Sequence, residues 1–371
     1  MSYTPSNSRV AVRPPFLATF ALVFGAIAAL FAIDMFLAKV ERSETAAQAA
    51  RLYGQGRQLA AAGRYNDAIV SFRAALAVSR DNAAYQLALA NALLGAGKPD
   101  DTETLLRELL QRDATNGEAS LLMARALARQ RQIAEAESYY HMAIYGRWPR
   151  DAEANRIAAR FELIDLLVKL DAKQELLAEL LPLQDEPLTD PATRARIARL
   201  FLVAGSPDRA AGLFRRILRH EHQDAGAYAG LGEAEFARGN YRTAESVLVV
   251  ALRLNPGDAE IREDLDLCDE VVGLDPTPRG LSPAARFTRA RKILQLTFDS
   301  VKQCAASPAL GPLTAQATEA LGRRISAPRQ ADAAEADLNL AEKLWQARKT
   351  SCASAQPPNQ ALSLVMEKVS Q

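Results

Sequence analysis

The sequence holds few residues whose types and spacing could do chemistry. It contains three histidines, and His220-Glu221-His222 is its one local cluster of candidate metal ligands. Side chains two positions apart on a helix do not face each other, and no third ligand is evident, so a surface loop is the simpler interpretation. No H-E-x-x-H, P-loop, G-x-S-x-G or dinucleotide glycine motif occurs. The sequence therefore predicts no catalytic site, no metal and no cofactor.

The three cysteines form no motif either. Cys268, Cys304 and Cys352 lie far apart, and no C-x-x-C pair is present to indicate zinc or dithiol redox chemistry. Three cysteines are too few for a disulfide scaffold. Cys268 is expected to be a core cysteine.

Composition and charge narrow the class of protein. At 371 residues the chain exceeds one compact domain, so several units or one elongated array are expected. Ala and Leu dominate, and long stretches lack the Val/Ile/Thr-rich alternation of a β-sheet, which predicts an all-α protein. Lys plus Arg total 45 and Asp plus Glu total 44. This balance argues against nucleic acid as a partner.

One segment is apolar enough to cross a membrane. From Phe16 to Ile33 every residue except Thr19 is apolar or Gly, and apolar residues resume after Asp34. A helix over residues 15–38, preceded by a tail over 1–14, spans a bilayer core of about 30 Å. A cleaved signal peptide is the rival interpretation, but no small-x-small site follows the run. The sequence favours an uncleaved single-pass anchor.

The charges around this segment bear on its orientation. Positive residues flank both ends, and counting them nearly gives a tie. They are Arg9 and Arg13 before the segment, and Lys39, Arg42 and Arg51 after it. The leading tail has no acidic residue, whereas Glu41 and Glu44 follow the segment. We expect a bacterial-type protein with the rest of the chain on the periplasmic side, and a cytoplasmic-facing chain is the alternative.

A regular period of about 34 residues, the length of a helical-hairpin repeat, organises the middle of the chain. Two amphipathic helices joined by a short turn recur, and the corresponding turn positions are Gly63, Gly97, Arg131, Asp171, Gly205 and Gly239. Successive positions are one period apart except for the step from Arg131 to Asp171, which is lengthened by a six-residue insertion at 146–151. The period indicates a solenoid of six helical hairpins over residues 49–258. The repeats start near Ala49, Ala83, Gly117, Ile157, Pro191 and Ala225.

These hairpins resemble the tetratricopeptide repeat. The sixth unit carries the family's signature residues Tyr228, Leu231, Gly232, Gly239, Tyr241, Ala244, Ala251 and Pro256. The second and fourth units depart from the pattern, with Thr102 and Leu176 where a small residue usually lies between the helices. The resemblance implies a right-handed superhelix with a concave, ligand-facing surface.

The resemblance also implies a binding face. In this family the first helix of each repeat lines the inner groove, and its ninth residue points at the ligand. Those places hold Arg57, Asn91, Arg125, Asp165, Arg199 and Glu233, and neighbouring groove places hold Tyr53, Leu87, Leu121, Arg129 and Phe161. The row Arg57-Asn91-Arg125 resembles a carboxylate clamp, in which guanidinium and amide donors hold a peptide carboxylate. Tyr53 and Leu121 replace the clamp's lysines, however, and an ordinary solvated surface is the alternative.

Three further segments follow the repeats. A helix over 259–273 can cap the last repeat with its apolar side, while its acidic side is expected to be solvated. Two prolines make 274–281 a linker. Three helical segments over 282–353 predict a small up-down-up bundle, and 354–371 form a tail.

The bundle topology bears on two of the cysteines. Its first and third helices run parallel, so Cys304 and Cys352 at their ends should be neighbours. In an oxidising compartment they could form a disulfide that closes a loop of 48 residues, worth about 4 kcal/mol. Two unrelated free thiols are the alternative.

These observations favour a binding protein over an enzyme. We expect a membrane-tethered scaffold that holds peptide segments or protein partners, acidic ones among them, in envelope-complex assembly or chaperone-like holding. An enzyme with an unrecognised site in the C-terminal bundle is the alternative. The sequence leaves the oligomeric state open.

Overall fold

The chain is helical throughout the part that the structure describes. The computed structural model describes residues 15–184, 190–302, 310–351 and 359–370, and these residues contain helices and no β-strand. The helices are α1 (Pro15–Ala61), α2 (Tyr65–Val78), α3 (Ala83–Gly95), α4 (Pro99–Arg112), α5 (Gly117–Arg129), α6 (Ile133–Tyr145), α7 (Ala152–Lys169), α8 (Lys173–Gln184), α9 (Pro191–Val203), α10 (Pro207–Leu218), α11 (Ala225–Ala237), α12 (Tyr241–Leu254), α13 (Ala259–Leu274), α14 (Pro283–Lys302), α15 (Gly311–Gly322), α16 (Gln330–Ser351) and α17 (Gln360–Val369), with a short 3-10 helix at Ala327–Arg329. The all-α class expected from the sequence is confirmed.

The helices belong to two compact units, residues 1–166 and 167–371. In the first unit each helix from α1 to α6 packs against the next one. In the second unit the helices from α8 to α14 do the same. The first helices of neighbouring hairpins also touch, as α3 does with α5 and α9 with α11. This stacking lets each hairpin bury the apolar face that it cannot cover alone.

The sequence period corresponds to a left-handed backbone turn inside each hairpin. All six turn positions have a positive φ, between 52° at Asp171 and 75° at Gly239. The next residue then donates its N–H to a carbonyl five positions back, as Lys98 does to Leu93 at 2.9 Å. This is the hydrogen bond of a Schellman motif, which needs a left-handed residue after the helix. Glycine adopts that conformation without steric cost, which explains why it fills four of the six positions.

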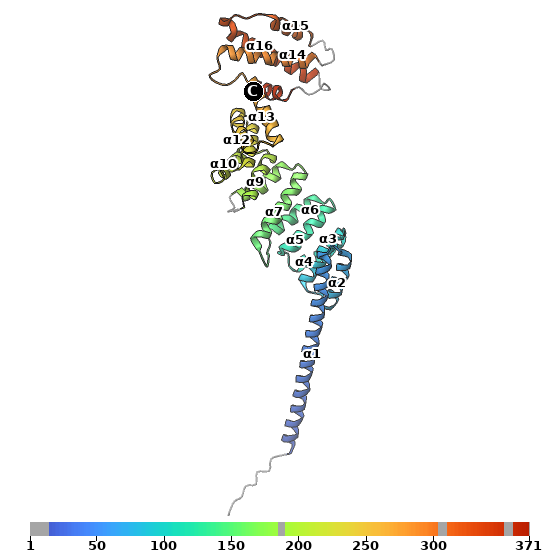
Figure 1. The fold of residues 1–371 in the computed structure, drawn as a ribbon. Helices are drawn as coiled ribbons and strands as arrows, with labels where there is room; N and C mark the ends of the chain where they lie inside the picture. The colour runs from blue at the N-terminus through green and yellow to red at the C-terminus, as the bar shows by residue number, and fades with distance from the viewer. Residues whose placement is uncertain (1–14, 185–189, 303–309, 352–358, 371) are drawn as a thin grey trace, which may run out of the picture. The chain divides into compact units, whose positions relative to one another are not determined.

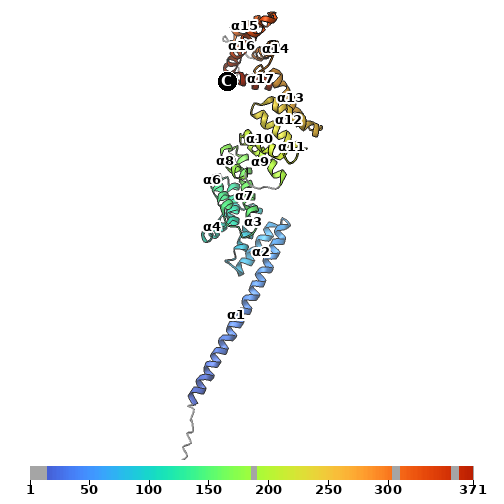
Figure 2. The ribbon, with the colours of Figure 1, turned by 90° about the vertical axis from the view of Figure 1, so that its left-hand side faces the viewer.

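The first helix joins the apolar segment to the first repeat. The sequence suggests a membrane helix over 15–38 and a repeat that begins near Ala49, but α1 runs through both as one helix of 47 residues. Figure 1 and, after a quarter turn, Figure 2 show the start of α1 projecting beyond the hairpin helices that follow it. The stretch from Phe20 onward is long and apolar enough to cross a membrane, and its most apolar window has no buried residue. Ala49 is the first fully buried residue of α1.

The insertion at 146–151 folds back onto the third repeat. The backbone N–H of Arg147 donates to Thr115 at 2.7 Å, and the N–H of Gly117 donates to Arg147 at 3.0 Å. The indole of Trp148 lies against Gly117, where a Cβ would come within 2.4 Å of the ring. The following helix α7 starts at Ala152, earlier than the repeat start expected near Ile157.

The second unit ends in a bundle that packs on the last repeats. Helices α14 and α16 pack together, and Arg291 of α14 pairs with Asp337 of α16 at 2.8 Å. Helix α17 contacts α13, α14 and α16, and Figure 2 labels it beside α13. Its residues Ala361, Leu362, Val365 and Met366 are at most 1% exposed.

Candidate functional site

The apolar members of the proposed binding face mainly hold the first repeats together. The ring of Tyr53 on α1 stacks on Tyr85 of α3, with 4.6 Å between centroids, and lies 5.8 Å from the ring of Phe72. Leu87 on α3 is 8% exposed and Leu121 on α5 is 7% exposed. Buried leucines and stacked rings at these places fix the spacing of α1, α3 and α5.

Two polar members of the face lie on the solvent side of the same helices. Arg57 and Asn91 are both exposed, one on α1 and the other on α3. The guanidinium of Arg57 lies 6.0 Å from the ring centroid of Tyr53, which is the outer limit of a cation–π contact. These two side chains present guanidinium and amide donors to solvent.

The other two predicted cations of the face in the first unit, Arg125 and Arg129, already have partners within the protein. Arg125 on α5 donates Nε to Glu162 on α7 at 2.8 Å and Nη2 at 2.5 Å, a bidentate pair in which each side chain is about a third exposed. Arg129 donates to the backbone carbonyl of Leu94 at the end of α3. A guanidinium already held by a carboxylate attracts a second anion less strongly. The row Arg57-Asn91-Arg125 is therefore not a uniform row of available donors.

The surroundings of Arg125 are partly desolvated. The hydrogen bonds to Glu162 raise the pKa of the guanidinium of Arg125. Burial raises the pKa of Glu118, and burial raises the pKa of Tyr140 to about 12. Glu118 and Glu162 both lie close enough to Arg125 for their charges to act on it. The sequence reasoning did not single out these two carboxylates, although Glu162 is adjacent to Phe161.

The two predicted face residues on α7, Phe161 and Asp165, also lie in the first unit. Phe161 is half-buried and Asp165 is exposed, one turn apart on α7. Asp165 gives this end of the face an anionic group where the earlier repeats have Arg57 and Arg125.

In the second unit the predicted residues lie beside the capping helix. Arg199 on α9 is exposed, and Glu233 on α11 is half-buried. Burial raises the pKa of Glu233, the carboxylate of Asp264 on α13 raises it further, and Arg199 lowers it. Asp264 is itself half-buried, and burial raises its pKa as well. The acidic side of the cap was expected to be simply solvated, so its approach to Glu233 was missed.

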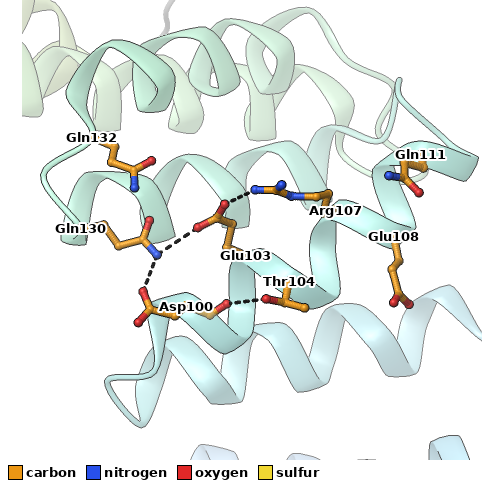
Figure 3. A pocket seen from close by; sticks show the side chains of 8 residues that line it. All are labelled: Asp100, Glu103, Thr104, Arg107, Glu108, Gln111, Gln130 and Gln132. Carbon is orange, nitrogen blue, oxygen red and sulfur yellow. Dashed lines mark hydrogen bonds and ion pairs between the residues drawn. The ribbon is translucent and has the colours of Figure 1, made fainter.

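A polar hollow in the first unit is lined by other residues than these. It has a volume of about 720 Å³ and is lined by residues of α4 together with Gln130 and Gln132 at the turn between α5 and α6 (Figure 3). The amide nitrogen of Gln130 donates to Asp100 at 2.6 Å and to Glu103 at 3.1 Å, and Glu103 also pairs with Arg107. Because Asp100 and Glu103 already have partners and no apolar side chain lines it, the hollow resembles solvated surface more than a ligand site.

The metal and cysteine candidates gain no support. Among the residues that the structure describes, no group of three His, Cys, Asp or Glu side chains converges to hold a metal. The Nδ1 of His222 lies 2.7 Å from the carbonyl oxygen of Leu218. Cys268 is fully buried, and burial raises the pKa of its thiol to about 12. Cys304 and Cys352 lie outside the described residues, so their disulfide stays a prediction.

Stacked helical hairpins, each with a left-handed turn at the same place, define a helical repeat protein in which first helices of neighbouring hairpins touch within each unit. A sequence model of the family described as tetratricopeptide repeat matches residues 59–107, 93–145 and 201–265. The chain contains tetratricopeptide repeats over these residues, as its sequence pattern predicted. No curated protein matches the chain.

Solved structures of other repeat proteins resemble parts of it. YrrB, described as a tetratricopeptide-repeat protein with an unusual peptide-binding site, has 18% identity and a TM-score of 0.40 over 52% of this chain and 96% of its own. A repeat protein from Cytophaga hutchinsonii has 16% identity and a TM-score of 0.45 over 73% of this chain and 100% of its own. PilW, described as a type IV pilus biogenesis factor, has 16% identity and a TM-score of 0.39 over 58% and 98%. These likenesses assign no partner to this chain.

Proposed function

We propose that this protein is a membrane-tethered scaffold that holds segments of other proteins on the face formed by the first helices of its repeats. The observation that supports this most is α1, in which an uncovered apolar helix continues into the first repeat. A chain with that helix needs an apolar surrounding for about 20 residues, and a bilayer provides it. The repeats would then work by binding, in envelope-complex assembly or chaperone-like holding of exported proteins.

Membrane attachment is tested on the full chain in its native cells. The protein should stay with the membrane pellet after alkaline carbonate extraction and should leave it in detergent. Intact mass should include the apolar segment, because cleavage of a signal peptide would remove that segment from the mature chain. A soluble, shortened chain would overturn the tether.

The flanking charges favour one side of the membrane. The acid-free tail with Arg9 and Arg13 favours a cytoplasmic N-terminus and repeats on the periplasmic side, and a cytoplasmic-facing scaffold is the alternative. Reporter fusions after Leu37 and at the C-terminus distinguish the two. A C-terminal alkaline phosphatase fusion should be active, and an active cytoplasmic reporter there would reverse the orientation.

The binding face is tested by crosslinking. A photoreactive residue at Arg57 or Asn91 should form adducts with partner proteins, whereas one at Arg73 on the second helix of the first hairpin should not. A preference for acidic segments rests mainly on Arg57 and Asn91, because Arg125 is already paired with Glu162. The change Arg57→Glu should then lower adduct yield more than Arg73→Glu does. Equal yields would remove these residues from the binding face.

A further inference from the structure

We propose that α1 is a rigid spacer that fixes the height of the first repeat above the membrane, so that this repeat receives segments of proteins that are themselves embedded in the same membrane. The inference rests on the proposed tether and adds a partner class to it. The face around Arg57 should then bind chain segments that lie within about 30 Å of the bilayer core. That distance is about the length of α1 beyond its apolar segment.

The part of α1 that precedes the first repeat has no residue at which a helix usually bends. Between Ala26 and Tyr53 the sequence contains neither Gly nor Pro, the residues at which helices usually kink or break. The ten residues from Lys39 to Gln48 are exposed and largely polar, yet the helix passes through them without interruption. An apolar span joined to a folded repeat by an unbroken helix transmits its position directly, whereas a flexible linker would not.

The C-terminal part of α1, from Ala49 onward, is fixed by packing. Gly56 lies against Phe72 of α2 so closely that a Cβ there would come within 2.5 Å of the ring. Tyr53 stacks on Tyr85 of α3, and Ala49 is fully buried. The last four turns of α1 are therefore part of the repeat, and the helix cannot swivel against it without breaking these contacts.

The helix rise converts this arrangement into a height. Arg57 follows Ala38, the end of the apolar segment, by 19 residues, which is about 28 Å at the rise of an α-helix. The headgroup layer takes up about 5–8 Å of that length, and a typical tilt of about 20° shortens it by only a few ångströms. Arg57 should therefore lie about 20 Å outside the headgroups. A partner held there must bring a segment to that height, as the membrane-proximal part of an embedded protein does.

The test measures this height in lipid vesicles by energy transfer. The full chain carries a donor dye at Arg57→Cys, with Cys304→Ser and Cys352→Ser, and the lipid headgroups carry the acceptor. Cys268 is left in place because it is fully buried and its raised pKa keeps the thiol unreactive. Two variants receive seven extra residues after Glu44, one insert being helix-forming and the other made of Gly and Ser.

The rigid spacer predicts a single narrow donor–headgroup distance for the parent chain. The helix-forming insert should increase it by about 10 Å, whereas the Gly-Ser insert should broaden it because such a linker fluctuates over about 15 Å. A parent chain as broad as the Gly-Ser variant would overturn the proposal. A chain that fails to float with the vesicles would instead overturn the tether itself, so the two failures are distinguishable.

The partner class has its own readout in native membranes. Adducts from a photoreactive residue at Arg57 should resist alkaline carbonate extraction, and the helix-forming insert should reduce their yield several-fold. Adducts formed only with carbonate-extractable proteins, or a yield unchanged by the insert, would overturn the assignment to membrane-embedded partners.

Discussion

The left-handed turn positions of the repeats allow one test in which two substitutions should change hairpin stability in opposite directions. Arg131 and Gly97 hold equivalent places in neighbouring hairpins of the first unit, with φ of 64° and 73°. Arg131 is an L-residue in a left-handed conformation that glycine would adopt freely. We therefore expect Arg131→Gly to stabilise its hairpin and Gly97→Arg to destabilise its own.

The magnitude follows from two opposing contributions. A non-glycine residue in the left-handed region costs about 1–2 kcal/mol, and glycine loses about 0.5–1 kcal/mol more on folding because its unfolded chain is freer. The net change is about 0.5–1 kcal/mol at each site. A Cβ at Gly97 would meet no other atom within 4 Å, so no steric clash adds to the cost there. The double variant should return close to the parent stability, since the sites do not share a partner.

Hydrogen exchange measured by mass spectrometry on the full chain in detergent resolves the two hairpins separately. Peptides covering α5 and α6 should exchange about two- to five-fold more slowly in Arg131→Gly, and those covering α3 and α4 faster by the same factor in Gly97→Arg. Shifts in the same direction at both sites, or faster exchange in Arg131→Gly, would refute the conformational explanation.

Three further measurements test the second unit. Glu235→Ala should lower the free energy of unfolding of this unit by about 2–3 kcal/mol in denaturant titrations, because the carboxylate is 1% exposed and pairs with two partly exposed arginines. Glu235→Gln keeps the shape of the side chain but removes its charge, so it should lose most of the same free energy, and parent-like stability of Glu235→Gln would count against the charge pairing. Burial alone would raise the pKa of Asp275, but its hydrogen bonds from Lys368 and Thr277 lower it overall. The stability that this carboxylate adds to α17 docking is therefore present above the ordinary pKa of 3.8 and is lost as the pH falls below it. Near-ultraviolet circular dichroism should show this acid-induced loss in the parent and a smaller loss in Lys368→Met. Equal acid sensitivity of the two proteins would contradict the role of this ion pair. Cys304 and Cys352 should resist alkylation without reductant in protein from its native compartment, and two modified thiols would rule out their disulfide.

The repeat frame was predictable because its physical requirement recurs at a fixed place. Each hairpin needs a left-handed residue after its first helix, and a regular sequence period follows from that need even where Arg131 and Asp171 replace glycine. The spacing of apolar residues also predicts which side of each helix packs against its neighbours. These signals are local, so they can be read from a single chain.

The continuity of α1 could not be predicted in the same way. Hydropathy marks where the apolar segment stops, near Ala38, but it does not mark where a helix stops. The polar residues from Lys39 to Gln48 look like a linker by hydropathy, yet they contain no helix breaker, and both neighbours of this stretch are helical. The early start of α7 was missed for a related reason, because the insertion hides the register of the repeat that follows it.

The binding face shows the same limit at the level of single side chains. Periodicity can place Arg57 and Arg125 on one side of the first helices, but it cannot say which partner each guanidinium meets. Glu162 approaches Arg125 from α7, 37 positions away in sequence, and pairs with it through two hydrogen bonds. An anionic segment held on this face would therefore meet Arg57 directly but would have to compete with Glu162 for Arg125. Under the proposed tether, the more accessible cation would therefore lie at the end of the face that α1 holds near the bilayer.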